Sequence, residues 1–196
     1  MFNTKQKGYI MSKYVPGRNS LINHAIGFAT TAHGSQVRKG NEHIPYIFHP
    51  IDVANEVIYY SDLPQKLIEV ASVVAILHDT VEDTQVSDQD VRDQFGDRIA
   101  DGVAFVTKDE SVPQPEQLRE NLIRLEVAPL EIKAVKMADR VSNLKAFPAM
   151  WDRDRIGRYL DDSVLISGSL GDASEMLNAR LLNRVAEMRN ILSLSK

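Results

Sequence analysis

The feature that most constrains the fold is the stretch of residues 71–84, ASVVAILHDTVEDT, in which an apolar run ends in four polar side chains of metal-binding type. The apolar run predicts a buried helix. If the helix continues, His78 lies over Glu82, because residues four apart share a face, and Asp79 lies over Asp83 in the same way. Carboxylates so close repel one another unless a cation is present. The stretch therefore predicts half of a metal site, with a helix end and a solvated turn as the alternative.

Two other segments offer the missing ligands. His49 directly precedes a proline that suits the first turn of a helix, so it is either a capping residue or a ligand. A second apolar helix, predicted from Pro129 onward, carries Asp139 on the same face as Asn143. Because a buried carboxylate needs a partner, Asp139 either pairs with Arg140 or completes the metal site.

Composition narrows the chemistry further. The chain has no cysteine, which excludes disulfides, thiolate zinc sites and cysteine nucleophiles. Histidine and carboxylate ligands suit Mn²⁺, Mg²⁺, Fe²⁺ or Zn²⁺. A net charge of −4 without a basic run argues against nucleic acid as a partner. No apolar run reaches the about 18 residues of a membrane span, and no signal peptide is evident, so we expect no membrane partner and a cytoplasmic protein.

The periodicity predicts an all-α protein with one domain of about eight to ten helices. We expect a loose lead-in over residues 1–19 and a domain over 20–196. Ser20 is predicted to cap the first helix, and Ser87 with Asp90 resembles a capping box. Residues 109–116 are predicted to form a loop, and glycines at 168–171 to end a short helix around residues 159–166. The last helix, residues 173–194, is predicted to be either a homodimer face or part of the core.

These motifs resemble those of a known family. In their order, His49-Pro50, His78-Asp79, Glu82-Asp83 and Asp139 look like the HD-domain phosphohydrolases. The phrases AHGSQVRK, PYIFHP, AILHDTVEDT, FGDRIADGVAFVTK and KMADRVSNL are similar to the hydrolase domain of the RelA/SpoT alarmone enzymes over residues 33–144. Since the chain leaves no room for a synthetase domain, it most resembles the stand-alone small alarmone hydrolases. The resemblance implies a single HD-domain helical bundle, with residues 150–194 as C-terminal helices.

The resemblance also implies a reaction, which removes the 3′-pyrophosphate of guanosine tetra- or pentaphosphate and leaves GDP or GTP. It implies that Mn²⁺ is the ion, and that its ligands are His49, His78, Asp79 and Asp139. Water and proton handling would fall to Glu82 and Asp83. Contacts to the small-molecule nucleotide substrate would come from Arg38, Lys39, Asn143 and Tyr159. Read without the family, the adjacent cations Arg38 and Lys39 either meet an anionic substrate or form a solvated pair.

Other functions stay open at this point. The same site would serve adenosine alarmones, or act on NADPH as a 2′-phosphatase. A non-catalytic nucleotide sensor on the same scaffold is a reading of another class. Two departures from related enzymes, the His43-Ile44 insertion and Ser142 in place of a frequent histidine, are expected near the nucleobase. We expect His24 and His33 to be surface or packed side chains, because neither has a carboxylate at useful spacing.

Overall fold

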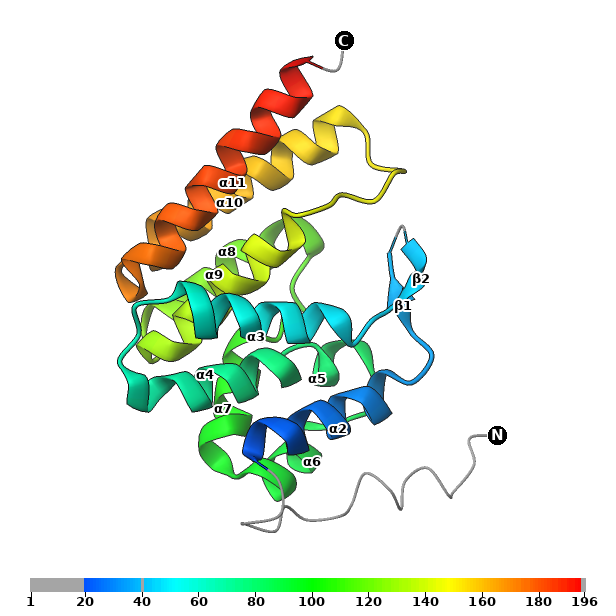
Figure 1. The fold of residues 1–196 in the computed structure, drawn as a ribbon, viewed down its shortest axis with the longest axis vertical. Helices are drawn as coiled ribbons and strands as arrows, with labels where there is room; N and C mark the ends of the chain where they lie inside the picture. The colour runs from blue at the N-terminus through cyan, green and yellow to red at the C-terminus, as the bar shows by residue number, and fades with distance from the viewer. Residues whose placement is uncertain (1–19, 40, 195–196) are drawn as a thin grey trace.

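The computed structural model describes residues 20–39 and 41–194, so the predicted lead-in over residues 1–19 lies outside the described residues. Figure 1 shows a bundle of helices with one small hairpin, which confirms the predicted all-α class. The elements in chain order are α2 (Leu21–His33), β1 (Val37–Arg38), β2 (Asn41–Pro45), α3 (Phe48–Tyr60), α4 (Gln65–Leu77), α5 (Thr80–Asp83), α6 (Asp88–Phe95), α7 (Asp97–Val106), α8 (Gln114–Glu126), α9 (Leu130–Asn143), α10 (Arg153–Leu170), the 3₁₀ turn η1 (Gly171–Ala173) and α11 (Glu175–Leu194).

Helix α4 lies at the centre of the bundle, packed against α2, α3, α7 and α9. Residues 71–77 are all buried, as the apolar run predicts. The one polar side chain among them, Ser72, donates its hydroxyl to the Ile68 carbonyl oxygen at 2.7 Å, so it adds no unpaired group. Helix α4 can therefore be surrounded by other helices while its C-terminal end points to the hairpin end of the bundle.

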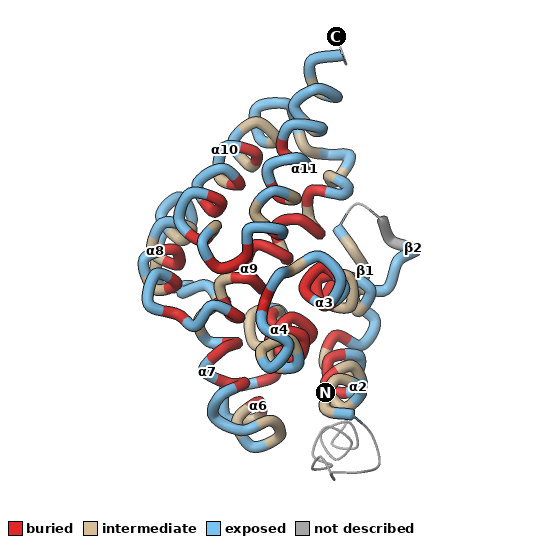
Figure 2. The backbone as a smooth tube through the Cα atoms, turned by 60° about the vertical axis from the view of Figure 1, so that its left-hand side comes forward, coloured by how far each residue is buried: buried red, intermediate tan, exposed pale blue. Residues whose placement is uncertain are grey.

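Helix α9 is the second buried element, in contact with α3, α4, α10 and α11. Figure 2 shows buried residues gathered where α3, α4 and α9 face one another. Because α9 is enclosed on several sides, its last turns lie beside the N-terminal turn of α3 and the C-terminal end of α4. Three segments far apart in sequence thus meet at one place.

The local signals at helix ends are confirmed. The Ser20 side chain accepts the backbone N–H of Asn23, and Ser87 and Asp90 form a reciprocal capping box at the start of α6. Gly96 separates α6 from α7 with a φ of 83°, a left-handed conformation that favours glycine. These contacts satisfy backbone groups at helix ends, so short-range sequence patterns suffice to predict them.

The motif helix differs from the prediction. Helix α4 ends at Leu77 instead of passing through the acids, and the single turn α5 follows a break at His78 and Asp79. Asp79 has φ −97° and ψ −3°, between helix and turn values. The Thr80 hydroxyl donates to the Leu77 carbonyl oxygen at 2.7 Å and satisfies an acceptor freed by the break.

Two helix boundaries were also predicted wrongly. Helix α8 begins at Gln114, so residues 114–116 belong to a helix whose first turn accommodates a proline, and the loop is shorter than 109–116. Helix α10 begins at Arg153 because Asp152 caps it by accepting the backbone N–H of Arg155 at 2.7 Å. It runs through Gly168 and ends at Leu170, where η1 turns the chain.

The segment expected as a loop with a short extended piece forms the β1–β2 hairpin, in which Val37 pairs with Pro45 and Arg38 with Asn41. At the other end of the chain, Figure 1 shows α10 and α11 side by side. Helix α11 buries Leu177, Leu181 and Val185, so one face belongs to the core. The homodimer face stays a prediction. Within the described residues, each helix is too short or too polar to cross a membrane.

Candidate metal centre and active site

Four side chains predicted as ligands converge on one point between α3, the α4–α5 break and α9. His49 Nε2 lies 3.2 Å from Asp139 Oδ1 and 3.6 Å from Asp79 Oδ2. His78 Nε2 lies 3.0 Å from Asp79 Oδ2 and 3.7 Å from Asp139 Oδ1. Two imidazole nitrogens and two carboxylate oxygens thus face one another in a largely buried place. His49, His78 and Asp79 offer ligand atoms that all lie within 4.8 Å of one another, a donor set that suits a divalent cation.

Each imidazole is held by its other nitrogen. His78 Nδ1 lies 2.7 Å from the Ala75 carbonyl oxygen, which can only accept, so Nδ1 carries the proton. His49 Nδ1 lies 3.1 Å from the Ser142 hydroxyl oxygen. Metal-binding histidines are usually oriented in this way by a partner on the second nitrogen. The bond at His78 leaves Nε2 as the nitrogen that faces the two carboxylates.

Electrostatics favour a cation at this point. Burial would lower the pKa of His78, but the neighbouring carboxylates of Asp79 and Asp139 raise it well above its ordinary value. Burial would raise the pKa of Asp79 and Asp139, but the two imidazoles hold both well below the usual range. The carboxylates therefore stay ionised in a buried cluster, where a divalent cation can neutralise them.

The alternatives for Asp139 and His49 are decided by geometry. Asp139 faces the two histidines, whereas Arg140 lies on another side of α9, with its guanidinium carbon 3.9 Å from the centre of the Tyr159 ring. The predicted alternative of an Asp139–Arg140 salt bridge is wrong. His49 makes no side-chain capping bond at the start of α3 and instead points into the cluster.

Tyr46 is a site residue that sequence reasoning missed. Its hydroxyl donates to Asp79 Oδ2 at 2.5 Å and lies 3.3 Å from Asp83 Oδ2. Its ring packs 4.6 Å from that of His33, which hydrogen-bonds Gln36 at 2.8 Å and is packed, as expected. Burial and the nearby Asp79 raise the pKa of Tyr46 strongly, so it stays a donor. The signal available in the sequence was its position in PYIFHP, three residues before His49.

Glu82 and Asp83 lie on the α5 turn beside the cluster, in different surroundings. Lys108, also missed from sequence, pairs its Nζ with Glu82 Oε1 and donates its backbone N–H to Oε2 at 3.1 Å. Asp83 keeps contact with solvent, but partial burial and the negative charges of Asp79 and Glu82 raise its pKa. The ammonium group of Lys108 thus fixes the carboxylate of Glu82, whereas the carboxylate of Asp83 takes up a proton more readily than usual.

Two of the residues predicted to bind substrate, Arg38 and Asn143, are connected to the ligand cluster by hydrogen bonds. Arg38 in β1 donates to Asn143 Oδ1 at 2.9 Å, and Asn143 donates to Asp139 Oδ1 at 2.6 Å. This chain of bonds ties the hairpin to the cluster and orients Arg38. Lys39 is exposed beyond it, although its charge still acts on Asp83.

Tyr159 comes from α10 and lies in an aromatic group with Phe147 and Trp151, whose ring centres are 5.9 and 5.2 Å away. Burial raises the pKa of Tyr159 to about 12, against the effect of Arg140. Ser142, which we expected near the nucleobase, is buried behind His49. His43 and Ile44 lie exposed in β2.

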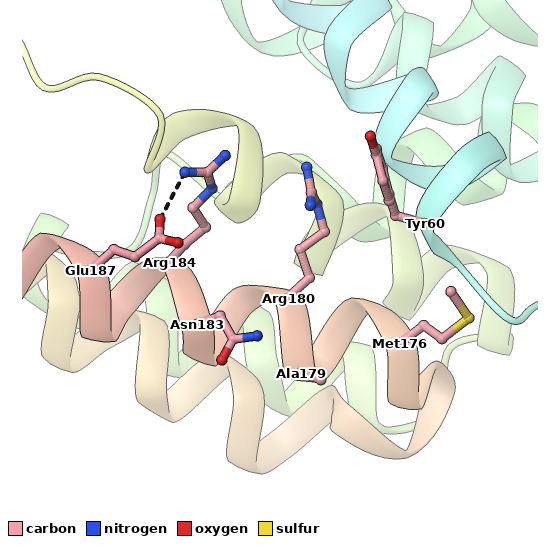
Figure 3. Close-up of a pocket in the computed structure, with 7 residues that line it drawn as sticks. All are labelled: Tyr60, Met176, Ala179, Arg180, Asn183, Arg184 and Glu187. Atoms are coloured by element: carbon pink, nitrogen blue, oxygen red, sulfur yellow. Dashed lines mark hydrogen bonds and ion pairs between the residues drawn. The ribbon is translucent and has the colours of Figure 1, made fainter.

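A pocket of about 390 Å³ lies elsewhere, between the end of α3 and α11. Figure 3 shows its lining, with Arg180 on α11 near Tyr60 and Arg184 paired with Glu187. Its lining includes none of the residues of the metal cluster. This pocket is therefore separate from the reactive site, which is defined by its converging ligands.

Known proteins resemble this chain in sequence and in fold. A family model described as HD domain matches residues 25–162. The guanosine-3′,5′-bis(diphosphate) 3′-pyrophosphohydrolase MESH1 of Xenopus tropicalis is 31% identical over 169 residues, or 83% of this chain and 91% of the relative. The Homo sapiens protein of that name is 32% identical over 164 residues, or 80% and 88%. A solved structure of a metazoan ortholog of SpoT that hydrolyzes ppGpp matches with a TM-score of 0.78 at 24% identity, covering 90% of this chain and 98% of that one.

Proposed function

Because this chain belongs to the HD domain family, we propose that it is a metal-dependent hydrolase that removes the 3′-pyrophosphate of guanosine 3′,5′-bis(diphosphate), leaving GDP and pyrophosphate. The corresponding pentaphosphate would leave GTP. The observation that carries the proposal is the convergence of His49, His78, Asp79 and Asp139 beside two further acids, in a chain that spans 91% of a relative named for this activity. The proposal makes the chain an enzyme acting on a small-molecule nucleotide.

The cluster fits a divalent cation. Two oriented imidazoles and two ionised carboxylates supply four ligands, and we assign Mn²⁺ because the resemblance to the alarmone hydrolases implies it. A bound divalent cation supplies Lewis-acid polarisation and makes a water molecule more acidic. The remaining steps fall to the side chains of the chain itself.

Glu82 and Asp83 have complementary roles in this proposal. Glu82 is held at both carboxylate oxygens by Lys108 and so is fixed in direction, which suits orientation of the attacking water as a general base. Asp83, whose pKa is raised, can carry a proton towards the leaving oxygen. A sensor without turnover would not need either acid so near the ligands, and this argues for catalysis.

The substrate contacts follow the positive charges. Arg38, oriented by Asn143, can bind a phosphate through charge-assisted hydrogen bonds, and Lys39 extends the positive surface. Tyr159 with its aromatic neighbours and the Arg140 guanidinium can pack against the nucleoside. Asn143 is shared by Arg38 and Asp139, so it links substrate binding to the ligand cluster.

The experiment is a parallel incubation of the purified protein with Mn²⁺ and guanosine tetraphosphate, its adenosine counterpart or NADPH, with the products separated by anion exchange. We expect pyrophosphate and GDP, and no product after addition of a chelator. Preferential conversion of the adenine nucleotide or NADPH would reassign the substrate. Binding of guanosine tetraphosphate without any product from the three would refute the enzymatic proposal.

A further inference from the structure

A line of polar side chains begins behind His49 and leads away from the ligand cluster. His49 Nδ1 lies 3.1 Å from Ser142 Oγ, and the Ser142 hydroxyl donates to Asp52 Oδ2 at 2.6 Å. Lys145 Nζ lies 2.6 and 2.8 Å from the two oxygens of Asp52. Asp52 belongs to α3, Ser142 to α9, and Lys145 to the segment that follows α9. None of the three is one of the four proposed metal ligands.

The direction of the hydrogen bonds follows from the chemistry of the groups. Burial would raise the pKa of Asp52, but hydrogen bonds from Lys145 and Ser142 outweigh it and lower this pKa, so the carboxylate only accepts. The single hydroxyl proton of Ser142 is used towards Asp52. Ser142 Oγ must therefore accept the proton of His49 Nδ1, so Nε2 is the nitrogen that faces Asp139, at 3.2 Å from Oδ1.

The far end of the line is fixed by a second carboxylate. Lys145 Nζ also lies 2.7 Å from Glu56 Oε1, and Glu56, only 1% exposed, receives two hydrogen bonds from the guanidinium of Arg180. Figure 3 shows Arg180 beside Tyr60, and its guanidinium carbon lies 3.7 Å from the centre of that ring. Lys145 is thus held between two carboxylates and cannot easily leave Asp52.

We propose that Asp52 is a positioning residue that acts through Ser142 to hold His49 as the Nδ1–H tautomer, the form able to bind a metal through Nε2. Lys145 and Glu56 keep Asp52 in place. The inference rests on the proposed function in one respect, since it takes His49 to be a metal ligand.

A purely structural role for Asp52 makes a different prediction. If Asp52 only joins α3 to the end of α9 by its ion pair with Lys145, its removal lowers stability and leaves the imidazole of His49 unchanged. If it positions His49, its removal frees the Ser142 hydroxyl to donate to Nδ1, and the proton moves to Nε2. The tautomer is therefore a readout that packing alone does not alter.

The experiment compares wild type with Asp52→Ala and Ser142→Ala, and uses Ser72→Ala as the control. The Ser72 side chain is also buried, but its hydroxyl bonds only a backbone carbonyl in α4. In metal-free protein, at a pH at which the imidazole is neutral, nitrogen-15 NMR reports the tautomer of His49. We expect Nδ1–H in wild type and Ser72→Ala, and loss of this preference in Asp52→Ala. An Nδ1–H imidazole as dominant in Asp52→Ala as in wild type would overturn the proposal.

Mn²⁺ affinity, measured by competition with a fluorescent chelator, is the second arm. We expect about 10- to 100-fold weaker binding in Asp52→Ala and Ser142→Ala. Ser142→Thr, which keeps the hydroxyl, should bind like wild type and so separates the hydrogen bond from packing. Equal affinity in wild type, Ser142→Ala and Ser72→Ala would refute the inference. If wild type itself fails to bind Mn²⁺, the proposed function fails, and the tautomer measurement still decides the role of Asp52.

Discussion

Lys108 holds the carboxylate of Glu82 at both oxygens, with its Nζ on Oε1 and its backbone N–H 3.1 Å from Oε2. Burial would lower the pKa of Lys108, but Glu82 raises it, so the lysine is charged at neutral pH. Glu82 lies on the α5 turn, and Lys108 lies in the segment that follows α7. A side chain that follows a helix end thus fixes the acid that we assign to the attacking water.

Replacement of Glu82 by Gln should therefore lower kcat by about 10²- to 10⁴-fold, the usual contribution of a positioned general base. Lys108→Met should lower kcat by part of that amount, because the carboxylate remains but loses its direction. Lys108→Arg, which keeps the charge, is the matched control and should retain most activity. Pyrophosphate release under saturating substrate is the measurement, and full activity in Lys108→Met would contradict the assigned role of this contact.

Mn²⁺ should stabilise the folded protein through the four converging ligands. At a concentration 100 times the dissociation constant, a ligand adds about 2.7 kcal/mol to the free energy of unfolding, or roughly 5 to 10 °C in Tm for a domain of this size. Asp139→Asn should abolish this increase.

Asp161→Asn is the control for the metal experiment, since Asp161 lies in an exposed ion pair with Arg189. It should respond to Mn²⁺ as wild type does. Thermal unfolding with and without the ion, each against a chelator blank, makes the comparison. An unchanged metal response in Asp139→Asn would remove this residue from the proposed ligand set.

Asp83 should make stability depend on pH in the metal-free protein. Its pKa is raised by partial burial and by Asp79 and Glu82, so folding favours its protonated form and the ionised form costs stability at neutral pH. Asp83→Asn should therefore be more stable than wild type at pH 7. The difference should shrink as the pH falls through the raised pKa and vanish below the ordinary value of 3.8.

Thermal unfolding of both proteins in a chelating buffer, at several pH values, tests this sign. The amide that Asp83→Asn introduces has nearly the size and shape of the carboxylate, so the comparison isolates the charge. A stability difference that is constant with pH, or one that grows in acid, would show that the charge of Asp83 is not the cause.

Tyr46→Phe should weaken Mn²⁺ binding by about 10- to 100-fold, because the hydroxyl that orients Asp79 is lost while the ring contact with His33 remains. Tyr59→Phe is a suitable control, since Tyr59 is 70% exposed and is not one of the site residues. Competition with a fluorescent chelator gives both affinities. Equal affinity in the two variants would mean that Asp79 needs no support from Tyr46.

The packing of α7 against α4 and α9 should tolerate no methyl group at Gly102. A Cβ there would lie 2.8 Å from side-chain atoms of Ile132 and Val74, so Gly102→Ala should cost about 1–3 kcal/mol. In α10, a Cβ at Gly157 meets no atom within 4 Å, and Gly157→Ala should stabilise by roughly 0.5–1 kcal/mol. Urea unfolding of both variants measures this difference in sign, and stabilisation by Gly102→Ala would contradict the packing argument.

Sequence patterns within single helices predicted much of the fold. The apolar run in α4, the Ser20 cap, and the Ser87 capping box with Asp90 are local, and the structure confirms all three. The boundaries that failed, at α8 and α10, depended on how a proline and a capping aspartate are used at a helix start. Sequence spacing alone does not distinguish a proline that ends one helix from one that begins another.

The sequence allowed us to predict which residue types would form the site, but only partly how these residues would be arranged in space. The spacing indicated that His78 and Asp79 belong together, but it assumed a continuous helix where the chain breaks after Leu77. Their roles, like those of Arg38 and Lys39, stay proposals. Tyr46 and Lys108 were missed because neither has a partner near it in sequence.

The sequence by itself determined the helical class, the buried run and the supply of histidines and acids, since these follow from periodicity and side-chain chemistry within short windows. Only the tertiary structure decided that Asp139 meets His49 and not Arg140, and that Ser142 and Asp52 lie behind His49. The reason is physical: contacts between elements depend on how α3, α4 and α9 pack against one another, and no local pattern encodes that packing.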